Sequence, residues 1–139
     1  MKIFLCGGGS GERAGEAMKT FGEIIDKKKP LLYIPLAMNE ERYPECLVWI
    51  KSEMKLIGIK NIHMIVNPKE LINVNYNDYC AIFLGGGNTY KLLNDIKSSG
   101  AFNKIKEYIE NDGIVFGGSA GAIIFGKNID TANMKMITK

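Results

Sequence analysis

The stretch Ile114-Val115-Phe116-Gly117-Gly118-Ser119-Ala120-Gly121 joins a short apolar run to a turn made of small residues. The apolar run Ile114–Phe116 predicts a buried strand, and the residues from Ala120 to Phe125 predict a helix. The turn between them matches G-x-S-x-G, in which a sharp strand-to-helix turn exposes a serine hydroxyl above the edge of a sheet. Ser119 is therefore a candidate nucleophile in an α/β fold. The alternative is a glycine-rich turn in which Ser119 only caps the following helix.

A second unit of the same kind lies upstream. Tyr79–Leu84 predicts a buried strand, Gly85-Gly86-Gly87-Asn88 follows it, and Thr89 can cap the next helix. Because the carboxyl ends of parallel strands meet at one edge of a sheet, we expect this glycine run to lie beside Ser119. Glycines leave backbone N–H groups unobstructed, so one of them could face the serine as an oxyanion donor. A turn built only for tightness is the alternative.

Short apolar runs alternate with longer amphipathic ones along the rest of the chain, which is typical of strands and helices in turn. The predicted strands are Ile3–Cys6, Leu31–Ile34, Asn61–Val66, Tyr79–Leu84 and Ile114–Gly117. The predicted helices are Glu12–Asp26, Tyr43–Ile57, Thr89 to about Gly100, Phe102–Glu110 and Ser119 to Gly126. Continuous apolar strands predict a mostly parallel sheet with helices on both faces. With no repeat or linker, residues 1–139 are expected to form a single α/β domain.

Composition narrows the class of protein further. The chain has 18 Lys+Arg against 15 Asp+Glu, and this small, scattered excess does not favour nucleic-acid binding. No apolar run is long enough to span a membrane, and the N-terminus lacks a signal-peptide pattern. The three cysteines, Cys6, Cys46 and Cys80, have no metal-ligand spacing and indicate a reducing compartment. We therefore expect a cytoplasmic protein with no metal and no cofactor.

The two glycine runs together resemble one known family. Phe83–Thr89, Leu92-Leu93 and Gly117–Ala122 are similar to peptidase family S51, which contains the aspartyl dipeptidases (peptidase E) and the cyanophycinases. The resemblance implies a three-layer α/β fold of the class I glutamine amidotransferase-like, flavodoxin-like type. It also implies hydrolysis of a short peptide, with an acidic residue at its N-terminus, through a covalent acyl-enzyme.

The resemblance also implies roles for particular residues. Ser119 would be the nucleophile, and the N–H groups of Gly86 and Ala120 would form the oxyanion hole. Gly87 and Asn88, which follow Gly86, are expected to contact the substrate. The amidotransferases have a cysteine at the position of Ser119, which argues against that activity here.

The sequence departs from the family at the positions of the catalytic histidine and aspartate. The family histidine lies downstream of the elbow, whereas the single histidine here, His63, lies upstream on a predicted strand and is expected to be structural. The family aspartate follows an asparagine, but here Met134 follows Asn133. The nearest acid, Asp130, is the candidate third member, and an ordinary polar loop residue is the alternative.

Two interpretations follow from the missing histidine. In the first, the chain lacks the C-terminal part of the family, and that part supplies the base. In the second, the protein is a catalytically silent relative that binds a small ligand or a partner. If Lys139 is the natural end, an exposed sheet edge could be covered by a second subunit, as in a homo-oligomer.

A third interpretation rests on the first glycine loop. Gly9-Ser10-Gly11-Glu12-Arg13-Ala14 matches G-x-G-x-x-A after the first predicted strand. Such a loop can bring a helix N-terminus against a pyrophosphate, which would make this a nucleotide-binding α/β protein. The acid expected after the second strand is absent, because Pro35-Leu36-Ala37 stands there. A simple strand–helix turn explains this loop equally.

Overall fold

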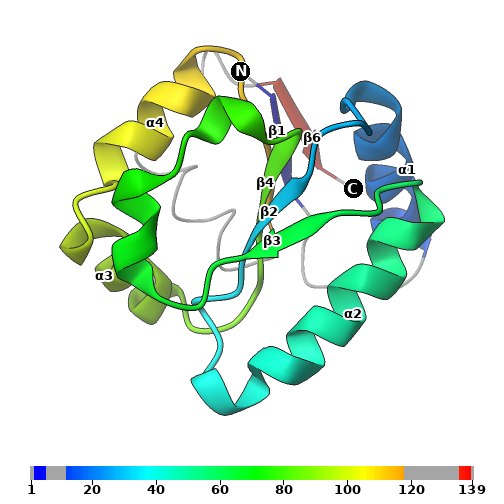
Figure 1. The fold of residues 1–139 in the computed structure, drawn as a ribbon. Coiled ribbons are helices and arrows are strands. Elements are labelled where there is room, and N and C mark those ends of the chain that lie inside the picture. The colour runs from blue at the N-terminus through cyan, green and yellow to red at the C-terminus, as the bar shows by residue number, and fades with distance from the viewer. Residues whose placement is uncertain (1, 6–11, 118–134, 139) are drawn as a thin grey trace.

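A computed structural model describes residues 2–5, 12–117 and 135–138, and it contains one parallel sheet with helices on both faces (Figure 1). The strands are β1 Lys2–Leu5, β2 Leu31–Ile34, β3 Ile62–Met64, β4 Ala81–Leu84, β5 Ile114–Gly117 and β6 Lys135–Thr138. The helices are α1 Glu12–Ile24, α2 Tyr43–Leu56, α3 Thr89–Ser98 and α4 Phe102–Glu110, with 3-10 turns η1 Glu40–Arg42, η2 Pro68–Asn73 and η3 Tyr76–Asp78. The strand order is β3-β2-β4-β5-β1-β6, and every neighbouring pair is parallel. The predicted parallel α/β arrangement is confirmed.

The register brings the ends of five strands to one level. Ile34 of β2 pairs with Leu84 of β4, and Leu84 pairs with Gly117 of β5. Gly117 pairs with Leu5 of β1, which pairs with Thr138 of β6. The segments that follow these strands therefore leave the sheet from the same row, at its carboxyl edge.

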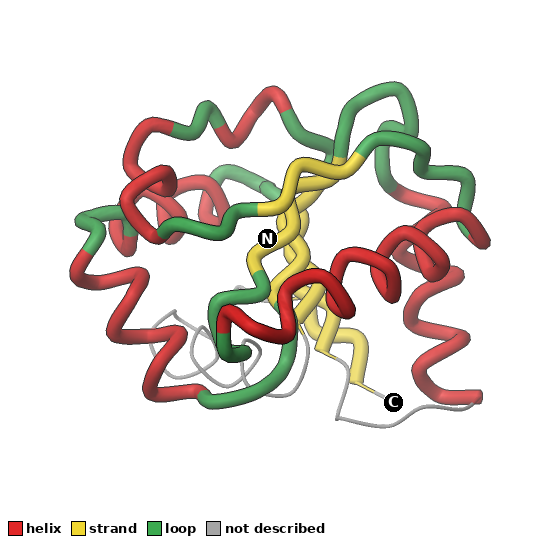
Figure 2. Tube along the Cα trace, turned by 60° about the horizontal axis from the view of Figure 1, so that its bottom comes forward, coloured by secondary structure: helices red, strands yellow, loops and turns green. Residues whose placement is uncertain are grey.

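The helices bury both faces of the sheet, as the apolar strands predict. Figure 1 shows α1 and α2 on one side of the strands and α3 and α4 on the other, and Figure 2 shows the same layers from another direction. Side chains along a strand alternate between the faces, so Leu31 and Tyr33 join one core while Leu32 and Ile34 join the other. The first core also contains Phe21, Ile50, Met54 and Phe83, and the second contains Leu92, Ile96, Ile105 and Ile109.

An aromatic cluster occupies the α1–α2 side of the central strands. The Phe83 ring stacks on Phe116 with centroids 4.8 Å apart, and it meets Tyr33 edge-on at 5.7 Å. Trp49 of α2 contacts the same ring edge-on at 5.9 Å while keeping 46% of its surface exposed. Trp49 therefore covers the outer side of the core, as expected for a core or interface residue.

The structure differs from the sequence prediction at the edges. Strand β6 was not predicted, because Lys135–Thr138 mixes polar and apolar residues; it forms by pairing with β1. Ile24, the last residue of α1, is 37% exposed, whereas Ile25 after it is buried. Cys6 and the helix predicted from Ser119 to Gly126 lie outside the described residues. None of the described helices is long and apolar enough to cross a membrane.

Replacing Phe83 tests the importance of the aromatic cluster. Phe83 is 2% exposed, so Phe83→Ala removes a buried ring and leaves a cavity, and we expect a loss of about 3–5 kcal/mol in the free energy of unfolding. Urea titration measures this loss. Leu56→Ala is the control, because Leu56 is 80% exposed and its truncation should change stability by less than about 0.5 kcal/mol. Equal effects of the two substitutions would contradict the assigned core.

The buried thiol of Cys80 predicts a dependence of stability on alkaline pH. Burial raises the pKa of this thiol from 9.0 to about 11 in the folded protein. The unfolded chain therefore ionises first, so the stabilisation is complete below pH 9 and is lost as the pH rises towards 11. Between pH 8 and 10 the free energy of unfolding should fall by about 1 kcal/mol more in the natural protein than in Cys80→Ala. Parallel stability curves for the two proteins would show that the thiol contributes nothing.

Candidate functional site

The two glycine runs begin side by side at the carboxyl edge of the sheet. Strands β4 and β5 are hydrogen-bonded neighbours, and their last residues, Leu84 and Gly117, are paired. Gly85–Gly87 therefore leaves β4 beside Gly117, the last residue of β5, and adjacent strands are about 4.8 Å apart. The structure describes the Gly85–Asn88 half of the predicted site. Ser119, Ala120 and Asp130 lie outside the described residues.

The Gly85–Asn88 loop is held at both ends by backbone hydrogen bonds. The Gly85 N–H donates to the carbonyl of Ile34 at 3.0 Å, and the Asn88 N–H donates to the carbonyl of Ala37 at 2.8 Å. Between these two bonds, the N–H groups of Gly86 and Gly87 donate to no acceptor among the described residues. Two adjacent N–H groups are thus available for a ligand at the point where the sequence predicts oxyanion donors.

Glycine is required in this loop by backbone conformation and by space. Gly87 has φ +141, and a Cβ atom there would lie 2.5 Å from the carbonyl oxygen of Ala37. A Cβ atom at Gly85 would lie 3.3 Å from the hydroxyl of Tyr33, which is tighter than an ordinary contact. The loop therefore lies directly against the segment that follows β2, and larger residues would push it away.

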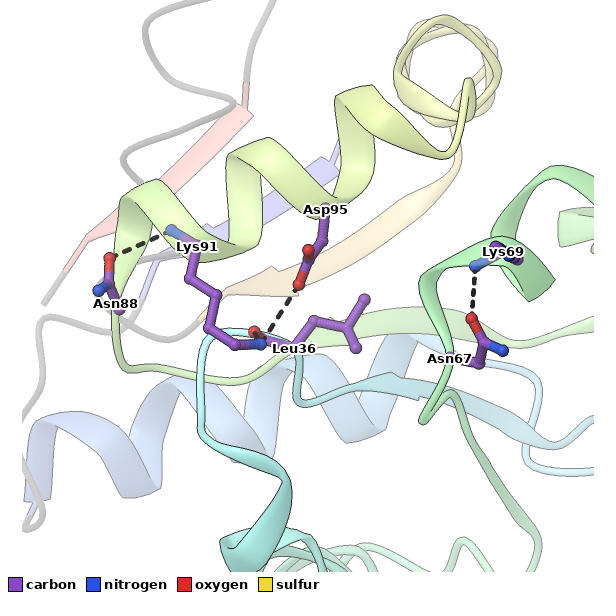
Figure 3. Close-up of polar contacts among 6 residues, drawn as sticks. All are labelled: Leu36, Asn67, Lys69, Asn88, Lys91 and Asp95. Atoms are coloured by element: carbon purple, nitrogen blue, oxygen red, sulfur yellow. Dashed lines mark hydrogen bonds and ion pairs between the residues drawn. The ribbon is translucent and has the colours of Figure 1, made fainter.

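Asn88 caps helix α3, a role that the sequence had suggested for Thr89. Its side-chain Oδ1 accepts a hydrogen bond from the Lys91 N–H at 3.1 Å (Figure 3). The same contact recurs at η2, where Asn67 accepts from the Lys69 N–H at 3.0 Å. The cap orients the first turn of α3, so Asn88 supports the loop directly. Contact of Gly87 or Asn88 with a substrate stays a prediction.

Lys91 links α3 to the segment after β2, and the sequence analysis did not single it out. Its Nζ donates to the carbonyl of Leu36 at 2.6 Å and forms an ion pair with Asp95 at 3.2 Å (Figure 3). Burial raises the pKa of the nearby Tyr43 hydroxyl, and the Lys91 ammonium opposes that shift. The i,i+4 spacing of Lys91 and Asp95 was the signal in the sequence for the ion pair. Nothing local indicated the contact with Leu36.

The layer under the loop is apolar and uncharged. Tyr33 is buried there, and this burial, together with the neighbouring Cys46 thiol, raises the pKa of its hydroxyl. The hydroxyl therefore stays protonated at neutral pH. Leu36 and Ala37, in the segment after β2, are also buried.

His63 does not lie at the site. It is on β3 at the edge of the sheet, three strand positions from β5, a separation of about 14 Å at normal strand spacing. His63 pairs with Leu32, which is two residues before the end of β2. It therefore lies two residues short of the carboxyl edge of the sheet. Its Nδ1 forms a hydrogen bond with the Tyr79 hydroxyl. These contacts agree with the structural role expected for His63.

The other site hypotheses gain no support from the described residues. No group of three His, Cys, Asp or Glu in residues 12–117 or in the short strands beside them could hold a metal ion. The Gly9–Gly11 part of the first glycine loop lies outside the described residues. Where a dinucleotide site would need an acid after β2, Leu36 and Ala37 are buried and bind the Gly85–Asn88 loop and Lys91.

Substitution of Gly87 tests how closely the loop approaches Ala37. Gly87→Ala combines an unfavourable φ with a Cβ atom 2.5 Å from a carbonyl oxygen, and we expect it to cost about 2–4 kcal/mol of stability. Gly100→Ala is a matched control with φ +81, where the new Cβ atom meets only Ile72 at 3.7 Å. This control should lose only about 1 kcal/mol, which reflects the backbone term alone. Equal losses in thermal or urea unfolding would contradict the close approach.

Comparisons with known proteins agree with this fold and loop. The sequence profile of peptidase family S51 matches residues 3–139. The chain is 30% identical over 122 residues to peptidase E of Shewanella denitrificans (strain OS217), covering 88% of this chain and 50% of that protein. It is 36% identical over 112 residues to peptidase E of Shewanella amazonensis (strain SB2B), covering 79% and 46%. The chain thus spans about half the length of these curated relatives.

Solved structures give the same result. A protein from Listeria monocytogenes EGD-e, provisionally assigned as a peptidase E, superposes with a TM-score of 0.62 at 25% identity, over 78% of this chain and 55% of that one. A peptidase from an acI-B1 Actinobacterium shares the fold with a TM-score of 0.66 at 21% identity, over 87% and 55%. These neighbours confirm the expected class I glutamine amidotransferase-like fold. Because the profile covers nearly the whole chain and the fold agrees, this protein belongs to peptidase family S51.

Proposed function

We propose that this protein is a serine peptidase-like hydrolase that cleaves short peptides, with Ser119 as its nucleophile. The observation that carries the proposal is the pair of N–H groups at Gly86 and Gly87. Neither group donates a hydrogen bond to a described residue. These N–H groups follow Leu84, the last residue of β4. Leu84 pairs with Gly117, where the G-x-S-x-G turn begins. Membership of a peptidase family supports the same reaction class.

The register supports a shared site for Gly86 and Ser119. Each is two residues beyond a paired strand end, Leu84 for one and Gly117 for the other. Two residues span at most about 7 Å of chain, and adjacent strands are about 4.8 Å apart. This register is compatible with the proposed site, in which Ser119 attacks a carbonyl group whose oxygen accepts from the Gly86 N–H.

The proposed reaction proceeds by acyl transfer. The Ser119 Oγ attacks the carbonyl carbon of the peptide bond and loses its proton to a general base. The N–H groups of Gly86 and Ala120 stabilise the oxyanion of the tetrahedral intermediate. The amine leaves with the proton from the base, and water then hydrolyses the ester on Ser119. Gly87 and Asn88 are proposed to contact the substrate backbone.

We propose a histidine other than His63 as the base. His63 is too far from β5, and a serine hydroxyl without a base is a weak nucleophile. Asp130 is proposed to orient that histidine as the third member of the triad. From the resemblance to the aspartyl dipeptidases of this family, the proposed substrate is a short peptide with an acidic N-terminal residue. The free thiols of Cys46 and Cys80 support a reducing, cytoplasmic location.

Labelling with a fluorophosphonate tests the nucleophile, because only an activated serine reacts quickly with this probe. The protein is isolated as its native source produces it, and its intact mass is measured before and after labelling. We expect one adduct, located on Ser119, and at least a 10⁴-fold (order of magnitude) loss of peptide hydrolysis in Ser119→Ala with no change in melting temperature.

Ser98→Ala is the control, since Ser98 is an exposed serine on α3. It should retain both the adduct and the activity. A protein that folds but never reacts with the probe would favour the catalytically silent relative. Unchanged hydrolysis in Ser119→Ala would refute the nucleophile assignment.

A further inference from the structure

We propose that Lys91 is a positioning residue, which holds the Gly86 and Gly87 N–H groups in place by fixing the segment after β2. This inference rests on the proposed function of those N–H groups. Lys91 belongs to α3, and among the described residues it forms no hydrogen bond with Gly86 or Gly87, so its effect would pass through Leu36 and Ala37.

The Lys91 ammonium makes two directed contacts on the inner side of α3. It donates to the backbone carbonyl of Leu36 at 2.6 Å and to the Asp95 carboxylate at 3.2 Å (Figure 3). The side chains of Lys91 and Asp95 are 32% and 23% exposed, so water screens this pair only in part. A partly buried, charge-assisted bond to a carbonyl is stronger than a neutral one.

The segment that Lys91 holds also carries the glycine loop. The carbonyl groups of Leu36 and Ala37 both accept hydrogen bonds, one from α3 and one from the residue that caps it. The first accepts from the Lys91 Nζ, and the second accepts from the Asn88 N–H at 2.8 Å. The Ala37 carbonyl oxygen is also the atom that a Cβ at Gly87 would approach most closely, at 2.5 Å. A shift of this segment would therefore move Gly87 and the N–H group beside it.

The position of Lys91 in its helix supports a role beyond helix stability. Asn88 is the N-cap and α3 begins at Thr89, so Lys91 lies in the first turn. A cation in the first turn is opposed by the helix dipole, and this position ordinarily favours acidic residues. The cation is held there by Asp95, one turn later, and by the carbonyl of Leu36, which belongs to another element. The long stem of lysine allows this contact across the two elements.

The chemical consequence of releasing Leu36 would be a displaced oxyanion hole. Donors stabilise an oxyanion only at hydrogen-bond distance, and a displacement of about 1 Å can lower the rate about 100-fold. A fluorophosphonate probe lacks the peptide backbone that Gly87 and Asn88 are proposed to contact, so with this probe the loss should appear in the rate of the chemical step.

The test compares Lys91→Met with Lys69→Met and the natural protein. Lys69 also follows a capping asparagine, but its own side chain is exposed and is joined to no described residue by a hydrogen bond or ion pair (Figure 3). Two quantities are measured: the rate constant and half-saturation concentration for fluorophosphonate labelling, and the amide hydrogen exchange of Asn88 by NMR. Melting temperatures verify that each variant is folded.

In Lys91→Met we expect the maximal labelling rate to fall about 10- to 100-fold while the half-saturation concentration stays within about twofold. The Asn88 N–H should exchange at least about tenfold faster, because its acceptor is no longer held. Lys69→Met should change neither quantity. Lys91→Arg keeps the charge and the donors, so it should retain most of the labelling rate and serves as the second variant if Lys91→Met does not fold.

The outcomes separate this inference from the proposed function. Faster exchange at Asn88 with an unchanged labelling rate would overturn the positioning role, as would unchanged exchange. If the natural protein is never labelled, the serine peptidase proposal fails. The positioning role then fails with it, and faster exchange at Asn88 would show only a structural contact.

Discussion

Strand β4 is the constraint on which the rest of the structure depends. Its four residues, Ala81–Leu84, are buried on both faces and are paired with β2 on one side and β5 on the other. Helices α1 and α2 cover one face and α3 and α4 the other, so β4 cannot slip by one residue without turning Phe83 and Leu84 into the wrong cores. The level of every segment that leaves the carboxyl edge follows from this register.

The position of β4 also determines where the Gly85–Asn88 loop lies, because the loop follows β4 directly and is bonded to β2 and the segment after it. The bond from the Gly85 N–H to Ile34 continues the sheet by one step, and the bond from the Asn88 N–H to Ala37 closes the loop. The chain between these bonds consists of glycines, and the N–H groups of Gly86 and Gly87 donate to no acceptor among the described residues. The segment after β2 thus fixes the position of the loop, which packs against the buried side chain of Tyr33.

Much of this could be predicted from the sequence where the signal was local. The helices Tyr43–Leu56 and Phe102–Glu110 and the strands Leu31–Ile34 and Ile114–Gly117 lie at or within one residue of their expected positions, because apolar periodicity and glycine boundaries mark them. Strand β6 could not be predicted, because its pairing with β1 alone makes it a strand. The sequence could not show that Asn88 rather than Thr89 caps α3, since both residue types can cap a helix.

The sequence by itself determined the α/β class, the alternation of elements, the family and the two glycine runs that mark the candidate site. These follow from patterns within a few residues of each other, which periodicity and turn chemistry can identify. Only the tertiary structure decided that Ala37 is the acceptor for Asn88, that Lys91 reaches Leu36, and that His63 stands three strands away from β5. The reason is physical: each of these relations joins residues far apart in the chain, and the register of the sheet brings some of them together and keeps others apart.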